Sequence, residues 1–305
     1  MSLRARLAYT FLTGYILTFY SEWMFWSGRP PSENFFLEAI PTWIAYSVIT
    51  FFFLTAVTYF RVQSLWTVFL AGALYGWLLE GVLVQTMYDA FPIQLSWTGL
   101  SWHALLTVMV GWGWLPRRLR DGKALLPCLL LGLALGLWSM GWWLEPDVAL
   151  APPLSVFIYN FCFGLLLLPA YILWSRYDLN QFYPSRVEII GALILLVGYF
   201  VFVTVPTQPL ALPVLPPLLA VVMWGLWKNR QRTTAVQFPV GEITVKQALP
   251  LLLIPIIASL VYTFALTIGL ILPTLQLVYI ITMPLGFIAL AVSLYKTIFQ
   301  GNKHV

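Results

Sequence analysis

Long apolar stretches recur along the chain, and short polar connections between them hold most of the charged residues. A helix needs about 20 predominantly apolar residues to cross the hydrocarbon core of a bilayer. Ten stretches meet or approach this length, and we predict that each is a transmembrane helix. The predicted spans are 7–26, 39–60, 65–91, 96–115, 124–143, 152–174, 187–205, 210–227, 247–272 and 273–295. The pattern therefore predicts an all-α, polytopic transmembrane helix bundle, with residues 1–305 forming a single integral membrane domain.

The composition excludes a soluble protein. Of the 305 residues, 61% are hydrophobic and only 9% are charged. A soluble domain is about 45–50% apolar and about 25% charged. A soluble fold of this length has too little interior to bury so much apolar surface. We therefore expect the lipid bilayer to be the main partner of this chain.

The basic residues test the number of spans. Ten spans place both ends of the chain on the same side of the membrane. That side would hold 15 of the 16 lysines and arginines, all except Arg29. Because basic residues concentrate in cytoplasmic loops, we predict that both termini are cytoplasmic in a multi-pass protein of the cell membrane. The net charge of +5 then reflects membrane topology, and we expect no nucleic-acid partner.

The eighth predicted span, 210–227, is the weakest. It is short, and the stretch 205–217 contains five prolines. The alternative is a re-entrant hairpin, which is tolerated at membrane depth only when protein surrounds it.

Glu80 is the most conspicuous polar residue, because it interrupts the apolar stretch 65–91. A carboxylate inside a bilayer costs at least about 3 kcal/mol, so such residues are rare and mark functional sites by default. At helical spacing Glu80 shares a face with Ala73 and Gly76. Small residues let a second helix approach closely, so we predict that Glu80 faces protein. A neutral carboxyl that serves only packing is the alternative.

Two further polar residues fall at a similar predicted depth. At 1.5 Å per residue, His103 and Asn160 lie roughly 10 and 12 Å below the outer ends of their spans, and Glu80 lies roughly 16 Å below. We predict that these three residues form a site in the outer half of the bilayer that binds a substrate or a proton. The secondary candidates are Gln85, Asp89, Thr107 and Glu22. Hydroxyl residues spaced along the other spans are expected to join helices to one another.

The stretch from Glu80 to Gln85 is spaced like the EExxxR motif of the CAAX-type intramembrane protease superfamily. His103 then resembles the histidine of the second motif of that family, and Asn160 the asparagine of the third. Gly81 stands in place of the second glutamate and Gln85 in place of the arginine. The resemblance implies a membrane-embedded enzyme with Glu80 as its base.

Three functions remain open. A buried carboxylate near a histidine is typical of proton relays, which favours transport of a small solute linked to protons. The lack of a soluble domain also fits a structural or assembly subunit that binds other membrane subunits. The third alternative is an enzyme acting on a lipid, an isoprenoid or a peptide, although the sequence shows neither a nucleophile motif nor a cluster of metal ligands. No pattern indicates a cofactor.

Overall fold

The computed structural model describes residues 1–145, 148–233 and 241–300. These residues form helices and no strands. The α-helices are α1 Leu3–Thr18, α2 Phe35–Tyr59, α3 Leu65–Leu78, α4 Gln94–Ser96, α5 Leu115–Arg120, α6 Leu125–Ser139, α7 Pro153–Trp174, α8 Arg186–Tyr199, α9 Val205–Thr207, α10 Ala211–Arg232, α11 Val245–Ala248, α12 Leu253–Ile268 and α13 Thr274–Tyr295. The prediction of an all-α bundle is confirmed.

Several of these helices continue directly into segments of wider or tighter winding. The π-helical segments, in which each N–H bonds five residues back, are η1 Phe19–Trp23, η2 Leu79–Leu83, η4 Trp97–Trp114, η7 Phe200–Thr204 and η9 Lys296–Gln300. The 3₁₀ segments are η3 Thr86–Tyr88, η5 Met140–Leu144, η6 Leu179–Gln181 and η8 Leu249–Leu252. Joined in this way, the described residues form ten long helical segments, one for each predicted span.

Eight of the ten segments are long and apolar enough to cross a membrane. The other two, residues 3–23 and 94–120, carry more polar side chains and correspond to the first and fourth predicted spans. The eighth span is a continuous helix, α10, of 22 residues despite Pro216 and Pro217. The re-entrant alternative for this span was therefore wrong. These apolar helices indicate an integral membrane protein whose outer surface contacts lipid.

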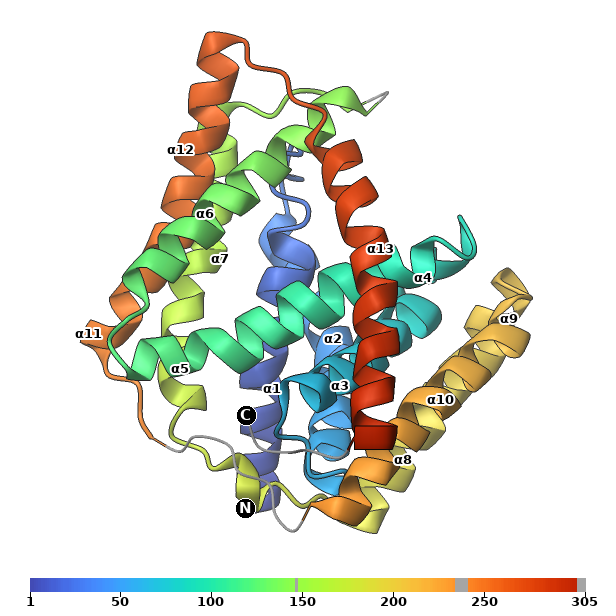
Figure 1. The fold of residues 1–305 in the computed structure, drawn as a ribbon. Helices are drawn as coiled ribbons and strands as arrows, with labels where there is room; N and C mark the ends of the chain where they lie inside the picture. The colour runs from blue at the N-terminus through green and yellow to red at the C-terminus, as the bar shows by residue number, and fades with distance from the viewer. Residues whose placement is uncertain (146–147, 234–240, 301–305) are drawn as a thin grey trace.

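Contacts between the connections support the alternation of the ten segments. The described parts of the connections predicted to be cytoplasmic lie along the left and lower sides of the molecule in Figure 1. They are joined by the Arg6–Glu188 ion pair and by hydrogen bonds from Arg120 to the Gly241 carbonyl and from Arg232 to the Thr297 carbonyl. On the opposite side, Thr207 donates to Gln85, Trp138 to the Phe25 carbonyl and Tyr262 to the Ala151 carbonyl. Lys303, one of the basic residues in the charge pattern, lies outside the described residues.

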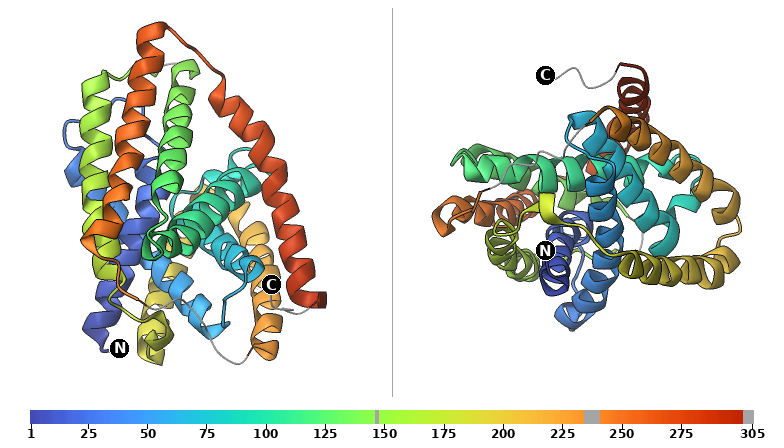
Figure 2. Two further views of the ribbon diagram at one scale, coloured as in Figure 1. Left: turned by 60° about the vertical axis from the view of Figure 1, so that its left-hand side comes forward. Right: turned by 90° about the horizontal axis from the view of Figure 1, so that it is seen from below.

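The helices fall into two packed groups that α1 and the α4–η4–α5 segment connect. Extensive packing joins α3 to η4 and α6 to α12, and α7 also packs on α12. Figure 2 shows α8 and α10 at one edge of the molecule and α12 at the other. The site described next lies between α1, α3 and η4.

The third span ends earlier than its apolar stretch. Its helix ends at Leu83, and Gln85 has a φ of 69°, a left-handed conformation that stops a helix. The chain then folds back, so that Tyr88 donates a hydrogen bond to the Gly81 carbonyl. Glu80 is therefore three residues from the end of its helix, roughly 5 Å at 1.5 Å per residue, whereas the apolar stretch to residue 91 predicted a helix that continues roughly 16 Å beyond it.

Candidate functional site

Two glycines of α3 let the polar segment η4 come close. A Cβ added at Gly76 would lie 2.9 Å from the His103 Cβ, and one added at Gly72 would lie 2.9 Å from the Ala104 Cα. Atoms at such distances would overlap, so the two helices can approach this closely only because both positions are glycine. The prediction that the Glu80 face of this helix is covered by protein is borne out by this packing.

Glu80 and His103 form a buried pair across the contact between α3 and η4. The Nε2 atom of His103 lies 2.7 Å from Oε1 of Glu80. The two residues are 5% and 2% exposed, so water reaches neither freely. A short hydrogen bond in such surroundings is stronger than one in water, because the local dielectric constant is low.

Three hydroxyl groups extend the pair on both sides. Thr86, in the turn that follows the third span, donates a hydrogen bond to Oε2 of Glu80. On the other side, Nδ1 of His103 lies 3.1 Å from Oγ of Ser21 in η1. Ser21 in turn donates to Thr107 of η4 over 3.2 Å. The polar cluster thus consists of Glu80, His103, Ser21, Thr86 and Thr107.

The hydrogen-bond directions determine how many protons the pair holds. Since Ser21 donates its only hydrogen to Thr107, its oxygen is left to accept one from Nδ1 of His103. The short contact between Nε2 and Oε1 then needs one more proton, which sits either on the imidazole or on the carboxyl. Both forms have no net charge, so the pair can be buried without leaving a net charge among the helices.

The cluster is built largely on π-helical segments. Glu80 belongs to η2, Ser21 to η1, and His103 and Thr107 to η4, which runs for 18 residues. π-helices are rare, and they occur frequently at functional sites. Three π-helical segments meet at this buried cluster, which distinguishes it from a contact between ordinary α-helices.

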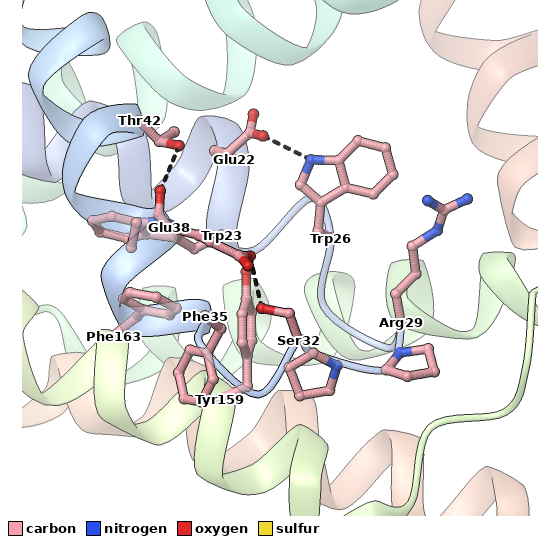
Figure 3. A pocket seen from close by; sticks show the side chains of 13 residues that line it. Glu22, Trp23, Trp26, Arg29, Ser32, Phe35, Glu38, Thr42, Tyr159 and Phe163 are labelled. Carbon is pink, nitrogen blue, oxygen red and sulfur yellow. Dashed lines mark hydrogen bonds between the residues drawn. The ribbon is translucent and has the colours of Figure 1, made fainter.

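Glu22, the neighbour of Ser21 in η1, lines a pocket near the cluster. Its two carboxylate oxygens accept hydrogen bonds from Trp26 Nε1 at 2.8 Å and from the Tyr46 hydroxyl at 2.5 Å. It interacts electrostatically with both Glu80 and His103. The pocket has a volume of about 280 Å³ and is formed by the connection between α1 and α2, the start of α2, and α7 (Figure 3).

The structure separates the remaining candidates from this cluster. Asn160 of α7 donates a hydrogen bond to Ser259 of α12 at 3.1 Å. Gln85 accepts a hydrogen bond from Thr207 near the outer surface, and Asp89 is exposed. Of the three main candidates, Glu80 and His103 therefore come together and Asn160 binds elsewhere. The secondary candidates Thr107 and Glu22 belong to the cluster and to its pocket.

Some residues of the site carried no usable signal in the sequence. Thr86 reaches Glu80 only because the chain turns back at Gln85. The Tyr75 ring, fully buried, stands edge-on to the His103 ring with centroids 6.0 Å apart. Ser21 has the spacing of residues that join helices, and its place beside His103 follows from the packing of α1 against η4.

Residues 1–145, 148–233 and 241–300 contain no group of three or more histidines, cysteines or acidic residues able to hold a metal ion. In comparisons with family models, with characterised proteins and with solved structures, the chain matches none. The geometry of the cluster and of its pocket is therefore what indicates a function.

Proposed function

We propose that this chain is a transporter of the cell membrane that moves protons through the Glu80–His103 pair, linked to the passage of a small solute. The observation that carries the proposal is the buried contact of 2.7 Å between His103 Nε2 and Glu80 Oε1. Carboxylate–histidine chains inside membranes are typical of proton relays. The charge pattern of the loops supports an orientation with both termini in the cytoplasm.

The pocket supplies the outer end of the route. Glu22 lines the pocket and follows Ser21 of the cluster in the chain, so in this proposal a proton arriving from outside would meet the Glu22 carboxylate before it reaches Glu80 or His103. Tyr46, which donates to Glu22, is 4% exposed and holds this carboxylate in place. Passage from the pair to the cytoplasmic side would require a second conformation, as in carriers that alternate between outward-open and inward-open states.

The alternative role as a subunit of a larger membrane complex is less well supported by the geometry. Packing between subunits needs no buried pair that shares a proton, and it needs no pocket that ends at a carboxylate. The resemblance to intramembrane proteases is also weakened, because Asn160 binds Ser259 and does not join Glu80 and His103.

The test is proton flux into proteoliposomes that contain a pH-sensitive dye, driven by a potassium diffusion potential. We expect the wild-type protein to acidify the lumen faster than empty vesicles do. Glu80→Gln keeps the shape of the side chain but removes the proton-binding carboxyl, so its flux should fall to the level of empty vesicles.

Asn160→Leu is the matched control, because it also removes a buried polar side chain from a helix contact. Its flux per reconstituted molecule should equal that of the wild type. Wild-type flux from the Glu80→Gln protein would refute the proposal, and so would wild-type protein no faster than empty vesicles.

A further inference from the structure

The pocket that Glu22 lines has the size of a site for a small molecule. Its volume of about 280 Å³ equals that of about nine water molecules at 30 Å³ each. This is just below the range of about 300–1,000 Å³ for drug-sized ligands, so a small ligand of about eight to ten non-hydrogen atoms would fill it. The pocket is open to the outer side, where Ser32 and Glu38 are exposed.

The charges around the pocket favour a cation. Two carboxylates, Glu22 and Glu38, line it together with one guanidinium, Arg29. Glu22 accepts hydrogen bonds only from the neutral donors of Trp26 and Tyr46, and Glu38 accepts one from Ser32 at 2.7 Å. Within the described part of the chain, neither carboxylate forms an ion pair with a basic side chain. Both carboxylates are therefore open to pairing with a cationic ligand.

Arg29 is engaged elsewhere. Its guanidinium carbon lies 4.6 Å from the centre of the Trp26 ring and 4.4 Å from that of Trp142. Figure 3 shows its side chain at the edge of the pocket, on the side away from Glu38. Its guanidinium is thus held against the two indoles, on the side of the pocket away from Glu38.

The rest of the lining is aromatic. The rings of Phe35, Tyr159 and Phe163 lie on the side opposite Arg29 (Figure 3). Trp23 stacks on Phe163 with centroids 4.3 Å apart, and Phe35 lies 5.4 Å from Tyr159. Aromatic faces attract ammonium groups, and sites that combine such faces with a carboxylate bind organic cations. The same rings also suit an apolar ligand body.

We infer that this pocket binds a small organic cation, an ammonium group on an apolar body, with Glu22 as its charged partner. The inference rests on the proposed function, because it names the class of solute that the transporter would carry. It places the ammonium group beside Glu22 and the apolar body against Phe35 and Tyr159.

The experiment is isothermal titration calorimetry on the purified full-length protein with three probes that share one ring. Benzylamine is a cation at neutral pH, benzyl alcohol is neutral and benzoate is an anion. We expect benzylamine to bind at least tenfold more tightly than benzyl alcohol, and benzoate to bind most weakly. Equal affinity for the amine and the alcohol, or a preference for benzoate, would overturn the inference.

Three variants locate the binding. Glu22→Gln retains an oxygen that can accept from Tyr46 but loses the charge, so it should bind benzylamine at least tenfold less tightly. Glu33→Gln makes the same change at an exposed position of the same connection, outside the pocket lining, and should bind like the wild type. Tyr159→Leu should weaken binding about threefold, which keeps the inference testable if Glu22→Gln does not fold. Unchanged affinity for benzylamine in a folded Glu22→Gln protein would contradict the inferred site. If Glu22→Gln does not fold, unchanged affinity in Tyr159→Leu would contradict it.

The two proposals fail in different ways. Benzylamine binding that depends on Glu22, together with proton flux that survives Glu80→Gln, would leave the cation site standing and remove the proton pathway. If proton flux requires Glu80 but the protein binds the three probes equally well, the proton pathway would stand and the cation site would be removed.

Discussion

Two helix contacts in this protein bury polar side chains, and they differ in what surrounds them. Between α3 and η4, the Glu80–His103 pair continues through Ser21 to Thr107 and lies near Glu22 and its pocket. Between α7 and α12, the side-chain amide of Asn160 donates one hydrogen bond to Ser259, and the amide oxygen Oδ1 accepts none from the described residues. The first contact forms a connected set of hydrogen-bonded groups that includes two titratable side chains, and the second is an isolated bond.

Both contacts depend on glycine in the same way. Gly76 allows η4 to approach α3, and Gly136 of α6 and Gly164 of α7 allow α12 to approach. Close packing of helices is thus common to the two regions and does not distinguish a site from a scaffold. What distinguishes them is whether the buried polar group has a titratable partner.

The largest effect on proton flux and stability is expected at Gly76, which packs against the helix that carries His103. Gly76→Ala places a methyl group against Gly99 and His103, so it should destabilise the protein by about 1–3 kcal/mol and also separate the pair. Gly136→Ala, whose methyl would lie 2.7 Å from the Val261 Cβ, should destabilise the protein to a similar extent. Thermal unfolding and proton flux per folded molecule measure the two effects separately.

Flux per folded molecule should fall at least tenfold in Gly76→Ala and stay at the wild-type level in Gly136→Ala. If both variants lose flux equally, the α3–η4 contact has no special role in proton flux.

An intermediate effect is expected at His103. His103→Gln keeps a hydrogen-bond donor for Glu80 but cannot take up a proton, so proton flux should fall at least tenfold while the melting temperature stays within a few degrees of the wild type. Retained flux in this variant would mean that Glu80 acts without its histidine partner.

The smallest effect is expected at Asn160. Asn160→Leu removes one interhelical hydrogen bond, worth about 0.6 kcal/mol in a membrane, and replaces an amide whose oxygen has no partner. The free energy of unfolding, measured by denaturant titration in detergent micelles, should therefore change by less than about 1 kcal/mol. A loss of several kcal/mol would show that this contact belongs to a larger polar network.

Much of the fold could be predicted from the apolar pattern, because the thickness of the bilayer sets the length of each span. The basic residues then indicate on which side of the membrane each loop lies. The protein-facing position of Glu80 was also predictable, since its face carries Gly76. The partners were harder to predict. The extra residue in each π-helical turn shifts which side chains share a face, so the helical spacing along 97–114 is not that of an α-helix.

The end of the third span shows a second limit. Nothing in the apolar run 65–91 reveals that Gln85 adopts a left-handed conformation, and this one residue brings Thr86 to Glu80. Asn160 illustrates a third limit, because depth along a helix does not specify which neighbour a side chain faces. Its actual partner, Ser259, lies 99 residues away in the sequence.

The position of Glu80 within one turn of the outer end of its helix has an electrical consequence. Carrying one elementary charge across the whole membrane against 100 mV takes about 2.3 kcal/mol. In the proposed transporter, a proton that passes from the outside to Glu80 would cross only the outermost part of that voltage drop. Loading of the pair should therefore respond mainly to the external proton concentration, and the voltage dependence of transport should arise in the later step toward the cytoplasm.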